Sequence, residues 1–261
     1  MTLFKYAVLL AGLAMLGPFS TDTYFPFFPD MARHFDVAPI ILQQSLSVYL
    51  LSFTVMMLFH GALSDSFGRR KVILWSLVGF ILTSIGCALA PTHDLLLIFR
   101  AFQGVTVGAG MVVGQAIIRD RFDGIEAQKL ISQVTMIFGL APAIAPVLGG
   151  WLHVYFPWQS AFVFLVMIGV LLLIACTLGL PESLPRSKRR PFKMNHLFIN
   201  YKVVLSNTRF MLLACSLGLG FGGFLIYVAS APDYVLNVLS LNTLQFGWLF
   251  IPIVIGLIGG S

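Results

Sequence analysis

The feature that most restricts the fold of this chain is a series of long apolar runs. Each run is about 20 residues long, the length that an α-helix needs to cross the hydrocarbon core of a bilayer. The runs do not alternate between apolar and polar residues, which argues against membrane-spanning strands. The sequence therefore predicts an all-α polytopic membrane protein. We expect eight spans, at 7–29, 44–63, 72–91, 95–116, 130–152, 159–180, 210–231 and 244–261.

The composition excludes a water-soluble globular protein. Hydrophobic residues make up 58% of the 261 residues, and charged residues only 10%, against about 25% in an ordinary soluble domain. The same apolar excess excludes a disordered chain. We do not expect a cleaved signal peptide, because the first apolar run is too long and no A-x-A-like site follows it.

Few residue patterns suggest catalysis or metal binding. The three cysteines, Cys87, Cys176 and Cys215, lie inside apolar runs without CxxC spacing, so we expect buried, inert thiols. His60 and Asp65 match an H-x4-D spacing found in some acyltransferases, but the turn is too short for a catalytic domain. We therefore expect a protein that is not an enzyme, with no catalytic residues, metal ligands or cofactor.

The distribution of positive charge predicts the orientation in the membrane. With the N-terminus in the cytoplasm, 14 lysines and arginines fall on inner segments and only Arg33 on an outer one. Inner loops of membrane proteins carry this excess. It explains the net charge of +6 without a nucleic-acid partner.

One long polar segment divides the chain. Residues 181–209 contain three prolines and seven positive charges, and we expect a basic cytoplasmic loop that sits on anionic lipid headgroups. The prediction is a six-helix bundle at 1–180, this loop, and a partial second bundle at 210–261. Because two spans cannot form a bundle comparable to the first, we expect a truncated chain or one that needs another chain.

Two charged residues lie inside predicted spans, where each costs about 2.5–3.5 kcal/mol. Asp22 lies roughly 10 Å below the outer end of the first span, and Arg100 roughly 8 Å below the same face in the fourth. Burial disfavours a charged carboxylate, and a nearby arginine favours it. We predict a proton-coupling site. The alternatives are a permanent ion pair, or an Arg100 side chain that reaches the outer headgroups.

The first span is interrupted around Asp22. Pro18 and Pro26 break the helical hydrogen-bond ladder, and hydroxyl residues, among them Tyr24, lie between them. Broken backbone at membrane depth is tolerated where it is buried in protein or lines a watery cavity. We therefore expect the first span to form a cavity wall.

The fourth and fifth spans carry small and helix-breaking residues. Two overlapping GxxxG pairs at 104–114 are explained by close helix packing. Packing does not explain Gln103 and Gln115, so each is a candidate for a ligand path. In the fifth span, Pro142 and Pro146 kink one helix face, which is consistent either with simple packing or with a bend that gates a cavity.

The turn after the second span, 61–71, combines a basic run with an acid. The positive-inside rule accounts for the basic residues. It does not account for Asp65 or for the glycines Gly61 and Gly68. We expect an internal charge network that forms in one conformation and breaks in another.

This turn resembles the loop pattern of the major facilitator superfamily, G-x-L-x-D-x-x-G-R-R/K-x-x-x-L. It departs from the pattern at Ser66, where arginine is frequent. The matching residues are Gly61, Leu63, Asp65, Gly68, Arg69, Arg70 and Leu74.

Two more spans resemble the twelve-span drug–proton antiporters of that superfamily. The fourth looks like its R-x-x-Q-G pattern at Arg100, Gln103 and Gly104, and the resemblance implies that this arginine takes part in proton coupling. The fifth is similar to the antiporter signature G-P-x-x-G-G, with Ala145 in place of the first glycine. The signature residues that remain are Pro146, Gly149 and Gly150, while small residues, Ser132 and Ala141, occupy two further glycine positions.

The first span resembles the D-x-Y-x-P element of the bicyclomycin- and chloramphenicol-resistance subgroup, at Asp22, Tyr24 and Pro26. The resemblance implies a major-facilitator-type N-terminal bundle followed by the first two helices of the C-terminal bundle. It implies a multi-pass exporter of the bacterial inner membrane, monomeric when full length. Such a carrier expels small amphipathic drugs in exchange for protons and is driven by the proton gradient.

The resemblance also implies roles for single residues. Asp22 and Arg100 would couple protons. The substrate cavity would include Tyr24, Gln103, Met111, Gln115 and Met136, although ordinary packing explains each methionine and aromatic taken alone. The gating motif would comprise Gly61, Asp65, Gly68, Arg69, Arg70, Pro142, Pro146, Gly149 and Gly150. A metabolite importer of the same fold and a non-transporting fragment remain alternatives.

Overall fold

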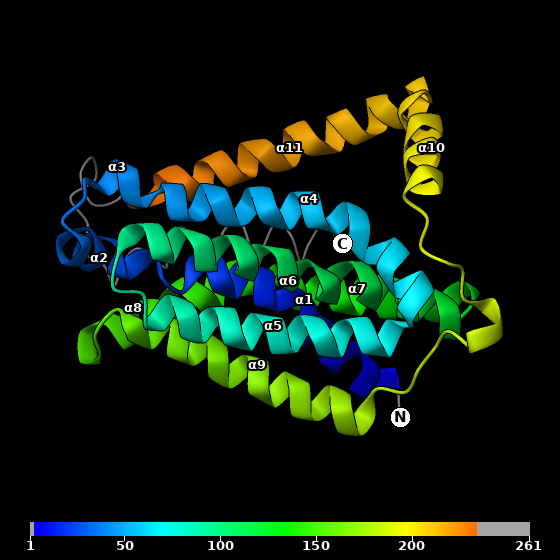
Figure 1. The fold of residues 1–261 in the computed structure, drawn as a ribbon, viewed down its shortest axis with the longest axis horizontal. Helices are drawn as coiled ribbons and strands as arrows, with labels where there is room; N and C mark the ends of the chain where they lie inside the picture. The colour runs from blue at the N-terminus through cyan, green and yellow to red at the C-terminus, as the bar shows by residue number, and fades with distance from the viewer. Residues whose placement is uncertain (1–2, 234–261) are drawn as a thin grey trace. The chain divides into compact units, whose positions relative to one another are not determined.

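The computed structural model describes residues 3–233, which fold into helices joined by short turns (Figure 1). These residues divide into two compact units, 3–190 and 191–233, and each is described by itself. No strand occurs in the described range. The expected all-α membrane fold is therefore confirmed.

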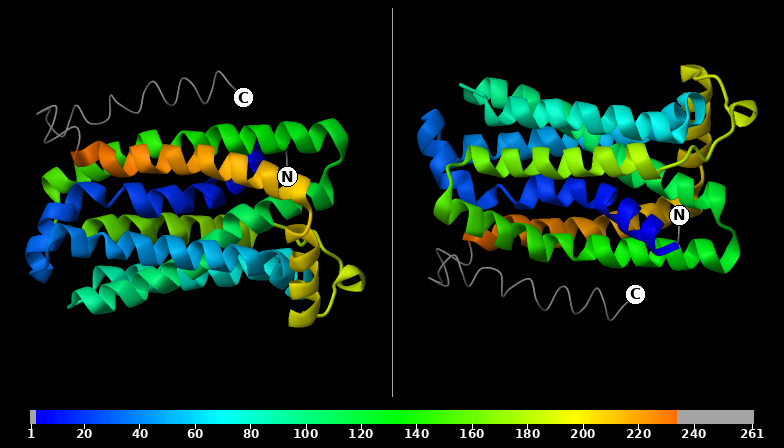
Figure 2. Two further views of the ribbon diagram at one scale, coloured as in Figure 1. Left: turned by 90° about the horizontal axis from the view of Figure 1, so that it is seen from above. Right: turned by 90° about the horizontal axis from the view of Figure 1, so that it is seen from below.

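The first unit is a bundle of long helices that run in alternating directions (Figures 1 and 2). Six helical stretches in it are long and apolar enough to cross a membrane, and they correspond to the first six predicted spans. The long helices are α1 (Leu3–Asp22), α4 (Gln44–Phe67), α5 (Arg69–Ala88), α6 (His93–Arg121), α7 (Gly124–Gly139), α8 (Ala141–Tyr155) and α9 (Gln159–Gly179). The short ones are η1 (Phe25–Phe27), α2 (Phe28–Phe35), α3 (Pro39–Leu42) and η2 (Arg186–Lys188).

The two ends of this bundle differ in charge. One end holds the start of α1, the α4–α5 turn, the α6–α7 turn and the end of α9 (Figure 1). Because Arg69, Arg70, Arg119 and Arg121 lie there, we call it the basic end. The opposite end carries α2, α3 and the turns that precede α6 and α9.

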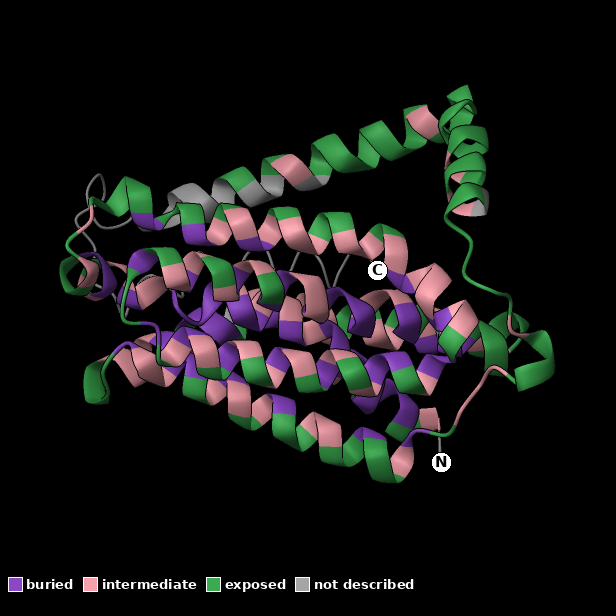
Figure 3. Ribbon diagram, viewed as in Figure 1, coloured by how far each residue is buried: buried purple, intermediate pink, exposed green. Residues whose placement is uncertain are grey.

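Helices α1 and α6 form the centre of the bundle. Within the most apolar window, 56% of the first span and 50% of the fourth are buried, against 11% of the second. Figure 3 shows the buried residues gathered along these two helices. Helix α6 packs against α1, α4 and α5, and α1 also packs against α7, α8 and α9. The two charges inside spans, Asp22 and Arg100, therefore lie on the two central helices.

Glycines set how closely α6 approaches its neighbours. A Cβ atom at Gly104 would overlap the main-chain oxygen of Tyr49 on α4, and one at Gly110 would lie 2.5 Å from the carbonyl oxygen of Leu13 on α1. Small residues permit this approach in membrane helices, where packing replaces hydrophobic burial as the driving force. Contacts within the chain thus account for the predicted GxxxG pairs.

Two of the spans are broken where the sequence places prolines. The first span changes from α1 to η1 after Asp22, and Pro26 lies at the start of η1. Pro18 lies inside α1, so the expected break at Pro18 was wrong. The fifth is broken at Leu140, with Pro142 in the first turn of α8. Proline lacks the N–H group that would continue the ladder and is favoured at a helix start.

The second unit contains α10 (Met194–Leu205) and α11 (Thr208–Asp233). The segments Leu197–Leu205 and Thr208–Gly220 meet at 85°, and together they would count as a seventh span. The expected loop at 181–209 thus includes a helix. Cys87 and Cys176 are buried as expected, but Cys215 on α11 is exposed, so the expectation of three buried thiols was wrong for Cys215.

Some expectations fall outside these observations. The eighth predicted span, 244–261, lies outside the described residues. The division at 180 and 209 remains a prediction.

Candidate functional site

Arg100 lies near the start of the central helix α6 and is completely buried, with 0% of its surface exposed. Its guanidinium lies over two aromatic rings, 4.6 Å from the ring centroid of Tyr24 and 4.2 Å from that of Tyr49. Cation–π contacts of this kind stabilise a cation that has lost its water. This burial excludes the alternative in which Arg100 reaches the outer headgroups.

Hydrogen bonds from Arg100 join several helices. Its Nη1 donates to the carbonyl oxygen of Ser20 at 2.9 Å and to Oε1 of Gln103 at 2.6 Å. The Ser20 carbonyl is one of the last four of α1, which lack partners within their own helix. Gln103 in turn donates from Nε2 to Oγ of Ser84 on α5 at 2.8 Å. Arg100 therefore caps the helix end at the break in the first span.

The two tyrosines beside Arg100 are fixed by their own hydroxyl groups. The Tyr24 hydroxyl shares a hydrogen bond of 3.1 Å with Oγ of Ser45 on α4. The Tyr49 hydroxyl donates to the carbonyl oxygen of Gly17 at 3.1 Å, which ties α4 to α1. The centre built on Arg100 thus joins α1, α4, α5 and α6.

Asp22 lies at the end of α1, two residues after the carbonyl that Arg100 holds. Its side chain is buried, and Thr21 Oγ1 donates to its Oδ1 at 2.7 Å. Within the described residues no ion pair joins Asp22 to Arg100. The alternative of a permanent ion pair between them is therefore wrong in this conformation.

The Arg100 side chain also has one nitrogen that forms no hydrogen bond within the described residues. Its Nη2 atom is buried and has no hydrogen-bond partner among the described residues. A buried cation that lacks a counter-ion is costly in a membrane, which makes such a residue a candidate for function.

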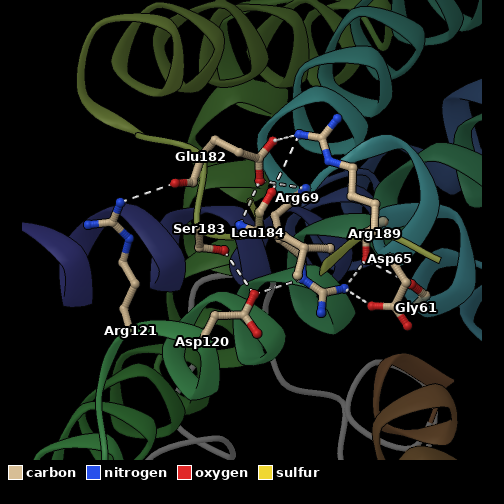
Figure 4. A network of polar contacts seen from close by, with 10 residues as sticks. Gly61, Asp65, Arg69, Asp120, Arg121, Glu182, Ser183, Leu184 and Arg189 are labelled. Atoms are coloured by element: carbon tan, nitrogen blue, oxygen red, sulfur yellow. Dashed lines mark hydrogen bonds and ion pairs between the residues drawn. The ribbon is translucent and has the colours of Figure 1, made fainter. Parts of the chain in front are cut away.

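At the basic end, the turn after α4 forms the charge network that its acid led us to expect (Figure 4). Arg69 is its hub: Nη1 pairs with Oδ1 of Asp65 at 2.5 Å, and Nε pairs with Oδ2 of Asp120 at 3.0 Å. Nη1 of Arg69 also donates to Oγ of Ser64 at 2.6 Å. The network therefore fastens the α4–α5 turn to the end of α6.

The segment after α9 enters the same network. The main-chain N–H of Arg69 donates to Oε1 of Glu182 at 2.9 Å, and Arg189 pairs with Oε2 of Glu182 at 3.3 Å. Ser183 donates to Oδ2 of Asp120 at 2.9 Å (Figure 4). Residues 181–190, expected to be part of a loop, are thus tied to the turn.

Gly68 makes room for this arrangement. Its φ of +102° lies in a region that other residues rarely adopt. A Cβ atom there would lie 2.6 Å from Nη2 of Arg189 and would overlap the carboxylate of Glu182. Both the backbone and the space at this position require glycine.

The structure does not gather the residues of the predicted substrate cavity on one surface. Tyr24 and Gln103 belong to the buried centre around Arg100. Met111 and Gln115 line a cavity of about 410 Å³ along α4 and α6. Met136 is 45% exposed on α7 and does not line that cavity.

The cavity of about 410 Å³ also includes predicted gating residues. Gly61, Asp65 and Arg69 line it together with Met111 and Gln115. The candidate ligand path on α6 therefore opens directly beside the charge network.

The fifth span contacts the broken part of the first. Pro146 and Gly149 are buried in α8, whereas Pro142 and Gly150 are half-buried. A Cβ atom at Gly149 would overlap the carbonyl oxygen of Thr23, the residue after Asp22. The packing interpretation explains Gly149, and it places α8 against the segment that carries the candidate proton site.

Several partners in these sites were missed by reasoning from the sequence. At the basic end they are Asp120, Glu182, Ser183 and Arg189. Around Arg100 they are Ser20, Ser45, Tyr49 and Ser84. The acids had a readable signal, since Asp120 stands between two arginines, as Asp65 stands in its own basic run.

The chain is similar to membrane transporters in sequence and fold. A profile of the Major Facilitator Superfamily matches residues 10–261. YdgK of Bacillus subtilis, an uncharacterized MFS-type transporter, is 35% identical over 94% of this chain and 61% of that protein. A multidrug resistance protein, MdtL of a Shewanella species, is 30% identical over 94% of this chain and 61% of its own length.

A bicyclomycin resistance protein homolog of Haemophilus influenzae is 27% identical over 99% of this chain and 65% of that protein. The chain thus spans about 61 to 65% of the length of these relatives. The human organic anion transporter MFSD10 has the same fold, with a TM-score of 0.72 at 20% identity, over 98% of this chain and 70% of that one.

Proposed function

Because this chain belongs to the Major Facilitator Superfamily, a family of carriers rather than enzymes, we propose that it is part of a proton-coupled drug exporter. The cargo would be small amphipathic drugs or other xenobiotics. Relatives named for multidrug resistance and for bicyclomycin resistance support export over import. The broken first span and the small residues of the fifth are consistent with helices that rock against each other.

The observation that carries this proposal is the arrangement of Asp22 and Arg100. Both are buried in one helical bundle, yet they do not form an ion pair. A carboxylate held by a fixed cation would stay ionised, whereas an unpaired one can bind a proton when its surroundings change. Asp22 lies at the break between α1 and η1, where a small movement alters its access to water.

Arg100 would position this proton site. It holds the carbonyl oxygen of Ser20 at the end of α1, so a shift of α6 would move the segment that bears Asp22. A substrate that donates a hydrogen bond to the deprotonated carboxylate of Asp22 would occupy the acceptor that an incoming proton needs. Proton uptake and substrate binding would then exclude each other, as antiport requires.

The charge network of the basic end would act as the gate. Its ion pairs hold the α4–α5 turn against α6 and residues 181–190 in this conformation. Opening of the cavity beside Asp65 and Arg69 would need some of these pairs to separate. The network would therefore favour one of the two conformations of the carrier.

We place the basic end in the cytoplasm and the protein in the bacterial inner membrane. Fourteen lysines and arginines lie on the segments that this orientation puts inside, as the positive-inside rule requires. The bacterial origin of the relatives named above supports the same membrane. Anionic lipids would then meet the basic segment 181–209.

The test is neutralisation of Asp22 in cells that express the gene encoding this chain. We expect Asp22→Asn to insert normally and to abolish the export of an amphipathic dye that depends on a proton gradient. The matched control is Asp94→Asn, because the Asp94 side chain is 95% exposed. Export by that variant should equal that of the wild type.

The direction of transport separates exporter from importer. An exporter lowers the dye content of energised cells, and collapse of the proton gradient restores it, whereas an importer does the opposite. Normal export by Asp22→Asn would remove Asp22 from the coupling mechanism. Loss of export in Asp94→Asn to the same degree would show that the effect is not specific.

A further inference from the structure

The basic end contains a second cavity that the proposed transport cycle does not use. It has a volume of about 550 Å³ and lies among the start of α1, the ends of α6 and α9 and the start of α5. Two arginines, Arg70 of α5 and Arg121 of α6, line it together with Tyr6 and the residues that follow α9. All of these belong to the first unit.

Both arginines carry charge that no residue within 3–233 neutralises in an ion pair. Arg70 Nη2 donates to the carbonyl oxygen of Thr177 at 2.7 Å, and Arg121 Nη2 donates to that of Glu182 at 3.2 Å. Neither forms an ion pair with a described residue. The Arg70 Nε atom is buried and has no hydrogen-bond partner in the described part of the chain.

Among the described residues that line the cavity, the one acid is Glu182, and its carboxylate binds groups other than the two arginines. Glu182 accepts hydrogen bonds at Oε1 from the main-chain N–H groups of Arg69 and Leu184, at 2.9 and 3.1 Å. Its Oε2 pairs with Arg189 at 3.3 Å, as Figure 4 shows. Only its main-chain oxygen contacts Arg121. The cavity therefore presents two positive charges without an opposing carboxylate.

The surroundings of the cavity are those of a membrane interface. It lies at the ends of spans, and Leu178 on its lining is 84% exposed. Phe4, two residues before Tyr6, is 71% exposed. At a membrane interface such side chains would contact acyl chains, whereas the guanidinium of Arg121 lies 5.8 Å from the ring centroid of Tyr6. Cationic pockets between spans at this depth suit lipid headgroups.

We propose that this cavity binds the phosphate of an anionic phospholipid headgroup. The guanidinium fork donates parallel N–H groups that match phosphate oxygens, and each arginine has donors left after its contact with the main chain. The bound lipid would bridge α5, α6 and the end of α9, next to the charge network. This inference does not depend on the proposed transport function.

The experiment measures lipid retention by the complete product of the gene that encodes this chain. Purified protein is offered phosphatidylglycerol and phosphatidylcholine in equal amounts, and bound lipid is counted by native mass spectrometry. We expect selective retention of phosphatidylglycerol by the wild type. The double variant Arg70→Gln and Arg121→Gln should bind it about tenfold more weakly for each arginine lost.

The matched control removes the same charge from the same end. Lys71 and Lys129 are exposed, so Lys71→Gln with Lys129→Gln should retain the lipid as the wild type does. Because loss of Arg70 and Arg121 can also harm folding, a second pair, Arg70→Lys with Arg121→Lys, keeps the charge but removes the fork. It should bind the lipid more weakly than the wild type at an unchanged melting temperature.

Four results would overturn the proposal. One is equal retention of both lipids by the wild type, and another is undiminished phosphatidylglycerol binding in both arginine variants. The third is displacement of the lipid by millimolar inorganic phosphate, which would assign the cavity to a free anion. Equal loss in the lysine control would mean only general attraction and would also contradict a specific site.

Discussion

At the scale of single residues, the buried arginine is the most informative feature. Arg100 meets two tyrosine rings, a helix-end carbonyl and a glutamine amide at the same time. A planar group with five donors can satisfy all of these partners. An ammonium group has the same charge but not this shape. The site therefore depends on the geometry of arginine as well as on its charge.

This dependence predicts the outcome of Arg100→Lys. The variant should insert into the membrane but melt at a lower temperature in detergent. Its export rate should fall at least about tenfold, which corresponds to a loss of about 1.4 kcal/mol of interaction energy. Arg33→Lys is the control, because the Arg33 side chain is 79% exposed and pairs with Asp30. Export assays and thermal melts of the two variants check the prediction. Wild-type export by Arg100→Lys would show that only the charge matters.

At the scale of helices, α8, which follows the break in the fifth span, contacts the broken part of the first span. Gly149 meets the carbonyl oxygen of Thr23, while nothing lies within 4 Å of a Cβ at Gly150. The two adjacent glycines can therefore be compared directly, because Gly149 lies at a helix contact and Gly150 faces open space. Because Gly149 packs directly against Thr23, we expect a movement of α8 to displace the neighbouring segment that carries Asp22.

The expected result is that Gly149→Ala destabilises the bundle by about 1–3 kcal/mol, because an added methyl group overpacks the contact. Gly150→Ala should be neutral or slightly stabilising, since alanine favours helix. Melting temperatures in detergent and export rates of both variants provide the measurement. Equal effects of the two substitutions would refute the assignment of the close contact to Gly149.

The charge network also acts at the scale of elements. It ties α4, α5 and α6 to residues 181–190 through Arg69, Asp120 and Glu182. The adjoining arginine cavity is also lined by residues of α5, of α6 and of the segment after α9. A lipid bound there would thus affect the same joint that we propose as the gate.

At the scale of the whole molecule, the architecture could be predicted from the sequence because backbone polar groups in a bilayer must be hydrogen-bonded within the protein. An apolar run long enough to cross it has few conformations available, so the spans follow from hydropathy. The breaks after Asp22 and at Leu140 follow from prolines. These features depend on local sequence alone.

The partners of the charged groups could not be predicted in the same way. Arg69 meets Glu182 across 113 positions and Asp120 across 51. Hydropathy tells which residues avoid water, but not which helix faces meet. For the same reason, the sequence did not show that the Arg100 guanidinium lies between two tyrosine rings.

The claim on which this account depends is that Asp22 exchanges a proton in response to substrate. The most direct measurement is proton release from the purified, complete gene product in weakly buffered solution as an amphipathic substrate is added. We predict release by the wild type and none by Asp22→Asn, with substrate still bound by both. Equal release by the two proteins would contradict the account.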